Sequence, residues 1–160
     1  MRARVGVGYD VHPFSADGST VLVLGGVVFP GEPGLSGHSD ADVAAHAVAD
    51  AILGAAGLGD IGMHFSDQDE RWKDANSIEL LARVAELVRE VGLKLVNADC
   101  TVVCERPRLV GSRKEMMENL SVAAGGPVHV KATRPERLGA LGRQEGIACM
   151  AVALLEEVSA

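Results

Sequence analysis

The chain has 160 residues, enough to bury a hydrophobic core, and we predict a single domain spanning residues 1–160. The net charge of −7 excludes a broad nucleic-acid-binding surface, because phosphate backbones require a basic footprint. No apolar run approaches the roughly 20 residues that span a membrane, and the N-terminus lacks the apolar core of a signal peptide. The three cysteines follow no disulfide-scaffold pattern, so a cytoplasmic protein with reduced thiols is predicted.

The N-terminal part of the chain is predicted to form strands. Residues 4–9 alternate, with β-branched side chains at intervals, and form a predicted strand that ends in the sequence Asp-Val-His-Pro at 10–13. Two short apolar runs, 21–24 and 27–29, are predicted strands joined through a Gly-Gly turn. A loop rich in Gly and Pro follows at 31–37.

The first helix is predicted over residues 40–57, where an Ala-rich run is ended by glycines. Ser39 has the side chain of an N-cap, and Asp42 follows three residues later in the relation of a capping box. The sequence therefore predicts that Ser39 caps this helix.

Helices and strands alternate irregularly in the rest of the chain. The predicted elements are a loop over 59–73, a helix from Asn76 or Ser77 to Gly92, a strand over 95–105 broken by Pro107, a helix over 113–124 and a strand over 128–132. Residues 147–155 fit a strand or a helix equally well. This mixture predicts an α/β or α+β sandwich with helices over a sheet.

The side chains that best suit metal binding fall in two segments. Asp10 and His12 are two residues apart, which places both on one face of a strand. His46 lies in the middle of the first predicted helix, and its i−4 and i+4 neighbours are Asp42 and Asp50. An imidazole flanked by carboxylates is typical of a metal-binding histidine.

Asp10, His12 and His46 together are a candidate site of one carboxylate and two imidazoles, the form of a catalytic zinc centre with an open position. In the alternative interpretation, His46 lies on a helix surface and Asp10 belongs to a turn. His38 and Ser39 precede the helix N-terminus, where backbone N–H groups favour a phosphate. The alternative there is that Ser39 only caps the helix and His38 is solvated.

Further motifs extend this pattern along nearly the whole chain. They are Gly8-Tyr9-Asp10-Val11-His12, His38-Ser39-Asp40-Ala41-Asp42-Val43 with His46, Gly59-Asp60-Ile61-Gly62 with Phe65 and Asp67, Lys131-Ala132-Thr133, Glu136, Gly142-Arg143 and Glu145-Gly146-Ile147-Ala148-Cys149. In order and spacing the sequence resembles the 2-C-methyl-D-erythritol 2,4-cyclodiphosphate synthase family. The resemblance implies an α+β fold, a single domain of helices over a mixed sheet, that assembles as a homotrimer with active sites between subunits.

The activity that the resemblance implies is a lyase reaction of isoprene biosynthesis by the non-mevalonate pathway. The substrate is 4-diphosphocytidyl-2-C-methyl-D-erythritol 2-phosphate, whose 2-phosphate oxygen attacks the β-phosphorus and expels CMP, giving the 2,4-cyclodiphosphate. The implied cofactors are zinc, or another divalent ion, and magnesium or manganese. By resemblance, Asp10, His12 and His46 bind the zinc and Glu136 binds the second ion. His38, Arg134 and Glu136 are the implied catalytic residues.

The resemblance also implies a set of substrate contacts. Those residues are Asp10, Val11, His12, His38, Ser39, Asp60, Ile61, Gly62, Phe65, Ser66, Asp67, Gln68, Asp69, Cys104, Pro107, Arg108, Leu109, Val110, Ala132, Thr133, Arg134, Pro135, Glu136 and Arg143. Asp60 is expected to accept hydrogen bonds from the methylerythritol hydroxyls, and the backbone of 104–110 to hold cytosine and the CMP phosphate.

The sequence departs from the family pattern at a few positions. Arg134 and Pro135 replace family threonines, which leaves the phosphate contact to the arginine or to a backbone N–H. Ala140 replaces a phenylalanine beside the apolar cavity on the threefold axis, where isoprenoid diphosphates can bind in the family. Arg143 and Glu145 match the charged residues near the mouth of that cavity; alternatively they form a local ion pair.

Two other functions compete with the cyclase. A zinc phosphoesterase using metal-bound hydroxide would release a hydrolysed product. A trimeric binding protein with a structural metal and an isoprenoid cavity would catalyse nothing. Structural zinc sites usually have four protein ligands rich in cysteine, whereas the three candidate ligands have no cysteine near them in sequence, which favours catalysis.

Overall fold

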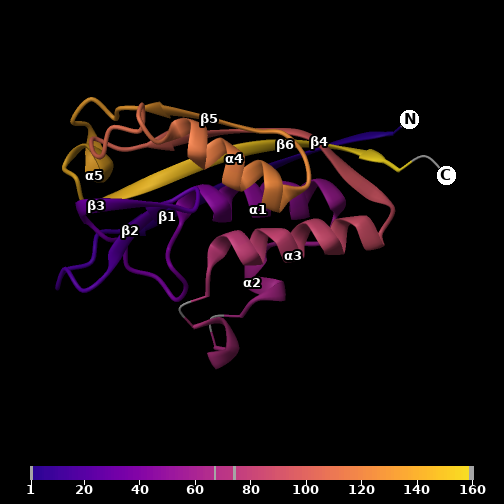
Figure 1. Cartoon of the computed structure of the whole chain (residues 1–160), viewed down its shortest axis with the longest axis horizontal. Coiled ribbons are helices and arrows are strands. Elements are labelled where there is room, and N and C mark those ends of the chain that lie inside the picture. The colour runs from indigo at the N-terminus through magenta and orange to yellow at the C-terminus, as the bar shows by residue number, and fades with distance from the viewer. Residues whose placement is uncertain (1, 67, 74, 159–160) are drawn as a thin grey trace.

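The computed structural model describes residues 2–66, 68–73 and 75–158 (Figure 1). The elements in chain order are β1 (Ala3–Pro13), β2 (Val21–Leu24), β3 (Val27–Pro33), α1 (Val43–Ala56), α2 (Ile61–His64), the 3₁₀ helix η1 (Glu70–Trp72), α3 (Ser77–Glu90), β4 (Leu93–Val103), α4 (Arg113–Ala124), β5 (Val128–Thr133), α5 (Gly139–Gly142) and β6 (Gly146–Glu157). None of the helices in these described ranges is long and apolar enough to cross a membrane.

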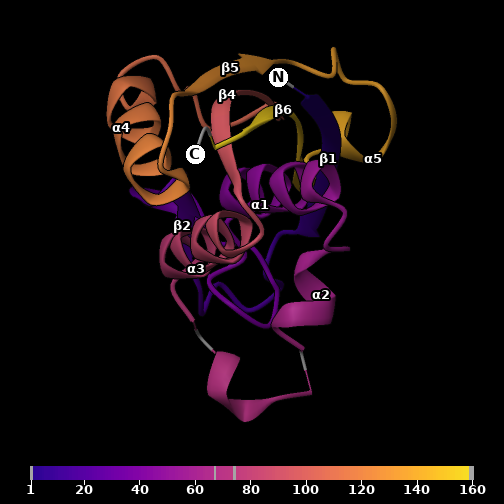
Figure 2. The same cartoon turned by 90° about the vertical axis from the view of Figure 1, so that its right-hand side faces the viewer.

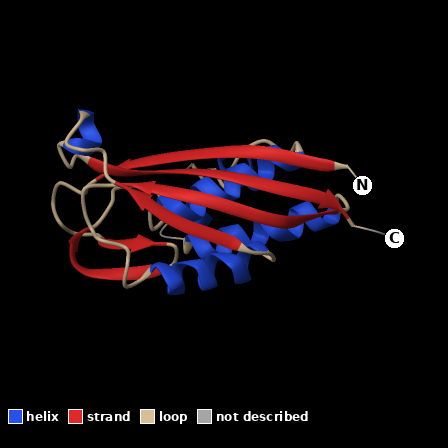
Figure 3. Cartoon of the chain, turned by 90° about the horizontal axis from the view of Figure 1, so that it is seen from above, coloured by secondary structure: helices blue, strands red, loops and turns tan. Residues whose placement is uncertain are grey.

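A mixed sheet forms one layer of the molecule and helices form the other. The four strands lie in the order β1-β6-β4-β5, with β6 antiparallel to both neighbours and β5 parallel to β4 (Figure 3). Helices α1, α3 and α4 lie on one side of this sheet (Figures 1 and 2). The predicted α+β arrangement of helices over a mixed sheet is therefore confirmed.

The bounds of most predicted helices and strands agree with the structure to within a few residues. Residues 147–155, which fitted either state, belong to strand β6, because β6 pairs on both sides within the sheet. Asn76 caps α3 through its side chain, as one of the two alternatives predicted. The predicted loop over 59–73 contains the short helices α2 and η1, which Asp60 and Asp69 cap with their carboxylates.

The predicted capping of the first helix by Ser39 is wrong. Helix α1 begins at Val43, and its N-cap is Asp42, whose carboxylate accepts hydrogen bonds from the first turn of the helix. The same carboxylate accepts from the backbone N–H groups of Gly25 and Gly26 in the β2–β3 turn, both at 2.8 Å. Asp42 caps the helix because its carboxylate accepts hydrogen bonds from both the helix and a distant turn. Its side chain is fully buried.

Two glycines of β1 allow α1 to lie directly against the strand. A Cβ atom on Gly6 would overlap the carbonyl oxygen of Ala51, and one on Gly8 would overlap that of Ala47. Helix α1 is rich in alanine and 12 of its 14 residues are buried, so small side chains line both surfaces of this contact. The close approach also brings α1 near the other side chains on the same face of β1.

The opposite face of β1 and β6 carries exposed apolar side chains. We call this surface the open sheet face; it consists of Val5, Val7, Tyr9, Val11, Met150 and Val152, each 47–69% exposed. The residues are contiguous, since Val7 pairs with Val152 and Tyr9 with Met150. A continuous apolar patch of this kind is typical of a protein–protein contact.

Gly8→Ala is expected to destabilise the protein by about 1–3 kcal/mol or more, because the added methyl group must push α1 away from β1. The free energy of unfolding from urea titration measures this effect. Gly111→Ala is the matched control, since a Cβ atom there meets open space. Equal stabilities of the two variants would contradict the direct contact between helix and strand.

Candidate functional site

The three predicted metal ligands meet at the junction of β1 and α1. The Oδ2 atom of Asp10 lies 3.1 Å from Nε2 of His12 and 3.0 Å from Nδ1 of His46. One ligand atom from each of the three residues lies within 4.8 Å of the others. Asp10 and His12 share a face of β1 with Gly6 and Gly8, so the close packing of α1 brings His46 to them.

One ring nitrogen of His12, Nε2, has no hydrogen-bond partner among the described residues. Its Nδ1 lies 3.1 Å from the carbonyl oxygen of Ser36, an acceptor, so Nδ1 carries the proton. Nε2 therefore carries no proton, and the lone pair of this buried atom lies beside the Asp10 carboxylate. Two acceptors that converge without a proton between them fit a cation, so the residues present suit a divalent metal ion.

The expectation that the helix neighbours of His46 flank its ring with carboxylates is wrong. Asp42 is occupied as the N-cap of α1, and Asp50 accepts a hydrogen bond from the backbone N–H of Ile61 at 2.8 Å. The carboxylate that reaches His46 comes from Asp10 on β1. Backbone donors that lack partners attract the helix carboxylates more effectively than an imidazole one turn away.

The cluster perturbs the ionisation of its members. Burial raises the pKa of Asp10, but its contacts with His46 and His12 outweigh burial and hold the pKa well below its usual range. Burial lowers the pKa of His46, but the hydrogen bond and charge of Asp10 outweigh burial and raise it. Without an ion, His46 therefore binds a proton more firmly than a free imidazole.

A cavity of about 310 Å³ opens beside the cluster, and we call it the metal cavity. Its lining residues are Asp10, His12, His38, Ser39, His46, Ile61, Gly62, Phe65, Trp72 and Leu80. The structure thus brings most of the predicted substrate contacts of this region together with the ligands. Trp72 and Leu80 were missed from sequence, although Trp72 is the single tryptophan of the chain and packs edge-to-face on Phe65 at 5.1 Å.

Several other predicted contacts lie outside the lining of this cavity, as far as the described residues show. Val11 points to the open sheet face, because it alternates with Asp10 and His12 along β1. The Asp60 carboxylate accepts from the backbone N–H of Met63 at 3.0 Å and so caps α2. The predicted loop contacts Ser66, Gln68 and Asp69 lie on the segment leading to η1, and Asp67 lies outside the described residues.

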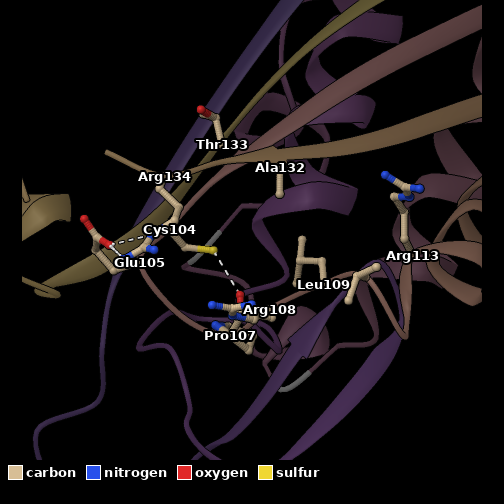
Figure 4. A pocket seen from close by; sticks show the side chains of 10 residues that line it. Cys104, Glu105, Pro107, Arg108, Leu109, Arg113, Ala132, Thr133 and Arg134 are labelled. Atoms are coloured by element: carbon tan, nitrogen blue, oxygen red, sulfur yellow. Dashed lines mark hydrogen bonds and ion pairs between the residues drawn. The ribbon is translucent and has the colours of Figure 1, made fainter. Parts of the chain in front are cut away.

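A second cavity, of about 710 Å³, lies between the ends of β4 and β5 and the start of α4, and we call it the second cavity (Figure 4). Its lining residues are Cys104, Glu105, Pro107, Arg108, Leu109, Val110, Arg113, Ala132, Thr133 and Arg134. Every predicted contact of segments 104–110 and 132–134 is present in this list. Glu105 and Arg113 are additional, and the sequence patterns did not single them out.

Glu105 fixes the position of Arg134, the residue that departs from the family pattern. Its Oε2 accepts from Nε and Nη2 of Arg134 at 3.1 and 2.8 Å (Figure 4). Its Oε1 accepts from the backbone N–H of Arg137 at 2.6 Å. The Glu105 side chain is only 4% exposed. The hydrogen bond from Arg137, followed by the contacts with Arg134, lowers the pKa of Glu105.

The other predicted residues of the C-terminal region line neither cavity, within the described part of the chain. Pro135 and the exposed Glu136 follow β5 in a turn, where Glu136 has a left-handed backbone with φ of 55°. Arg143 donates to Glu145 at 2.6 Å, which is the geometry of the local ion pair.

The two cavities lie at the same end of the sheet but at opposite edges. The metal cavity is built on the end of β1 and the second cavity on the ends of β4 and β5. Strands β6 and β4 separate β1 from β5. With a strand spacing of about 4.8 Å, the two edges are about 14 Å apart. One chain alone therefore does not bring the two cavities face to face.

The fold and the two cavities define an α+β protein with a candidate metal centre. The model of the YgbB family matches residues 3–156, so the chain belongs to the YgbB family. Its relatives include the 2-C-methyl-D-erythritol 2,4-cyclodiphosphate synthase of Geobacillus thermodenitrificans, which is 52% identical over 98% of this chain and 99% of the relative.

Solved structures agree with this assignment. The bifunctional IspDF of Campylobacter jejuni superposes with a TM-score of 0.93 at 41% identity, covering 99% of this chain and 43% of that one. The IspF of Plasmodium falciparum, solved as a CDP complex, superposes with a TM-score of 0.83 at 30% identity, covering 98% of this chain and 97% of that one.

The affinity of the cluster for zinc is expected to fall as the pH decreases through the raised pKa of His46, because the ion must displace a proton there. The stability of the metal-free protein has the opposite pH dependence and increases as the pH falls. The stability that comes from protonated His46 is full below the unfolded pKa and is lost as the pH rises through the folded one.

Zinc affinity measured by chelator competition over a series of pH values checks this prediction. His129→Ala, at an exposed position on β5, is the control and should leave the profile unchanged. A wild-type affinity that is constant, or that increases toward acid, would contradict the role of His46.

Proposed function

We propose that the chain is a phosphorus–oxygen lyase that converts 4-diphosphocytidyl-2-C-methyl-D-erythritol 2-phosphate to the 2,4-cyclodiphosphate and CMP. The 2-phosphate oxygen forms a bond to the β-phosphorus, and the bond from that phosphorus to the bridging oxygen breaks, so CMP leaves with that oxygen. The observation that carries the proposal is the Asp10–His12–His46 cluster at the wall of a cavity in a YgbB-family fold.

One carboxylate and two imidazoles suit zinc or a similar divalent ion, which supplies positive charge to polarise a phosphate oxygen. The chain's own residues orient the substrate around this position. His38 and Ser39 line the same cavity and are placed to donate hydrogen bonds to the phosphate. Ile61, Phe65 and Trp72 supply an apolar wall for the methylerythritol carbons. Phosphoryl transfer depends mainly on such positioning and charge neutralisation.

The second cavity is the proposed site for the cytidine end of the substrate. Its volume of about 710 Å³ accommodates a nucleotide, and a relative of known structure is described as a CDP complex. Arg108 and Arg134 at its lining supply positive charge for phosphate. Because Glu105 holds Arg134 through two nitrogens, the guanidinium keeps a fixed orientation and replaces the threonine of the family pattern.

A homotrimer unites the two halves of the proposed site. The cavities lie at opposite edges of the sheet, so a neighbouring copy is needed to place a nucleotide cavity beside a metal cavity. The open sheet face supplies the apolar surface for such an assembly. In this arrangement Glu136, which is exposed within one chain, binds magnesium or manganese at the join between subunits.

Two further parts of the proposal concern the location of the protein and a second ligand. A cytoplasmic location agrees with the three buried free cysteines. An isoprenoid diphosphate on the threefold axis would have to compete with Glu145 for Arg143, since the two residues are paired at 2.6 Å.

Phosphorus NMR of the purified protein with the diphosphocytidyl substrate, zinc and magnesium tests the proposed reaction. Equal appearance of CMP and a cyclic diphosphate is the expected result. CMP with an open-chain phosphate would instead establish the phosphoesterase. Binding of both metals without turnover would favour the binding protein, and either outcome would overturn the cyclase.

Glu136→Gln is expected to raise the magnesium concentration needed for half-maximal activity at least tenfold while leaving the zinc content unchanged, because an amide binds Mg²⁺ more weakly than a carboxylate. A magnesium titration of activity, with metal analysis of the protein, makes the measurement. Glu115→Gln, at an exposed position in the first turn of α4, is the matched control. An unchanged magnesium titration would remove Glu136 from this role.

A further inference from the structure

The side of the His46 ring away from Asp10 is held by a buried hydroxyl group. Ser77, the first residue of α3, is 1% exposed, and its Oγ lies 2.8 Å from Nε2 of His46. His46 is itself 7% exposed. Ser77 is not among the residues that line the metal cavity, so its contact is with the ligand and not with a substrate.

Asp40 determines which way the protons lie in this contact. Its Oδ1 accepts from the Ser77 hydroxyl, and its Oδ2 accepts from the Ser77 backbone N–H at 3.1 Å. An ionised carboxylate only accepts hydrogen bonds, so the single hydroxyl proton of Ser77 is directed to Asp40. The Ser77 oxygen then presents a lone pair to His46, whose Nε2 must carry the proton.

A proton on Nε2 has a direct consequence at the other nitrogen. In the neutral imidazole only one nitrogen is protonated, so Nδ1 of His46 is a free lone pair. Nδ1 is the atom that lies 3.0 Å from Asp10, within the metal cluster. The chain of contacts from Asp40 through Ser77 therefore selects the tautomer that a metal ligand requires.

Ser39 is the competing explanation, since its Oγ lies 3.1 Å from the same Nε2. This contact is longer than that of Ser77, and Ser39 makes no side-chain hydrogen bond to Asp40 among the described residues. Its hydroxyl is therefore free to donate or to accept and does not select a tautomer. The proton direction is fixed only through Ser77.

We propose that Asp40 and Ser77 are positioning residues that hold His46 as the Nε2–H tautomer with Nδ1 aimed at the ion. The inference rests on the proposed metal centre. Asp40 is suited to this task because its own backbone N–H donates to the carbonyl of Ala75 at 3.2 Å, which ties the segment before α1 to the start of α3. Loss of such an outer contact typically weakens metal affinity by about 10–100-fold.

The test compares Ser77→Ala with Ser39→Ala by zinc titration against a chelator. Ser77→Ala is expected to fold, because the N-cap of α3 is Asn76 and the Ser77 backbone N–H is retained. It should bind zinc about 10–100-fold more weakly than the wild type, whereas Ser39→Ala should show a much smaller loss. Circular dichroism confirms that the folds are equal.

A spectroscopic measurement distinguishes control of the His46 tautomer from a general loss of packing around the site. In the zinc-loaded wild type, the Nε2–H proton of His46 should give an NMR resonance that exchanges slowly with water, and Ser77→Ala should lose it. Asp40→Asn is a second variant, and the side chain it replaces contacts none of the proposed metal ligands. An amide has a single acceptor oxygen, so one of the two bonds to Ser77 is lost and zinc affinity should fall as well.

The outcomes distinguish this inference from the proposed function. If the wild type binds zinc and Ser77→Ala binds it as tightly as the wild type, or loses no more affinity than Ser39→Ala does, the inference is overturned and the metal centre stands. If the folded wild type does not bind zinc, the metal centre fails and the inference fails with it.

Discussion

The direct contact between the backbones of α1 and β1 is the constraint on which the rest of the site depends. Gly6 and Gly8 allow it, since a side chain at either position would overlap a carbonyl oxygen of the helix. The next two residues on that face of β1 are Asp10 and His12, so His46 on α1 reaches them at hydrogen-bonding distance. An enzyme that must hold a metal ion gains rigidity by placing its ligands on packed elements in place of loops.

Around this contact, three acids accept hydrogen bonds from different kinds of donor. Asp42 accepts from backbone N–H groups of α1 and of the β2–β3 turn. Asp40 accepts from both polar groups of Ser77. Asp10 alone faces imidazoles, one of which leaves its Nε2 without a hydrogen-bond partner in the described part of the chain. The geometry thus leaves one carboxylate for the proposed ion, whereas the other two stabilise the scaffold.

Local periodicity predicted most of the fold and the three candidate metal ligands, because strand and helix spacing place side chains on common faces. Periodicity failed to predict contacts in which the hydrogen-bonding or packing partner lies far away in the sequence. Asp42 and Asp50 have the helical spacing to flank His46, but backbone donors at Gly25, Gly26 and Ile61 take their carboxylates. Glu105 and Trp72 were missed for the same reason, since their partners Arg134 and Phe65 show no periodic relation to them.

The proposed division of the site between chains follows from the sheet order and gives the departure at Arg134 its meaning. In this proposal the substrate phosphates lie where two copies meet, because β6 separates the metal cavity on β1 from the second cavity on β4 and β5 within one chain. An unpaired arginine at such a join would add a mobile charge. Pairing with Glu105, which also accepts from the backbone of Arg137, fixes both the guanidinium and the turn that carries Glu136. In the proposed site, Arg134 therefore supplies a charged group whose orientation Glu105 restricts and whose side chain is 59% exposed.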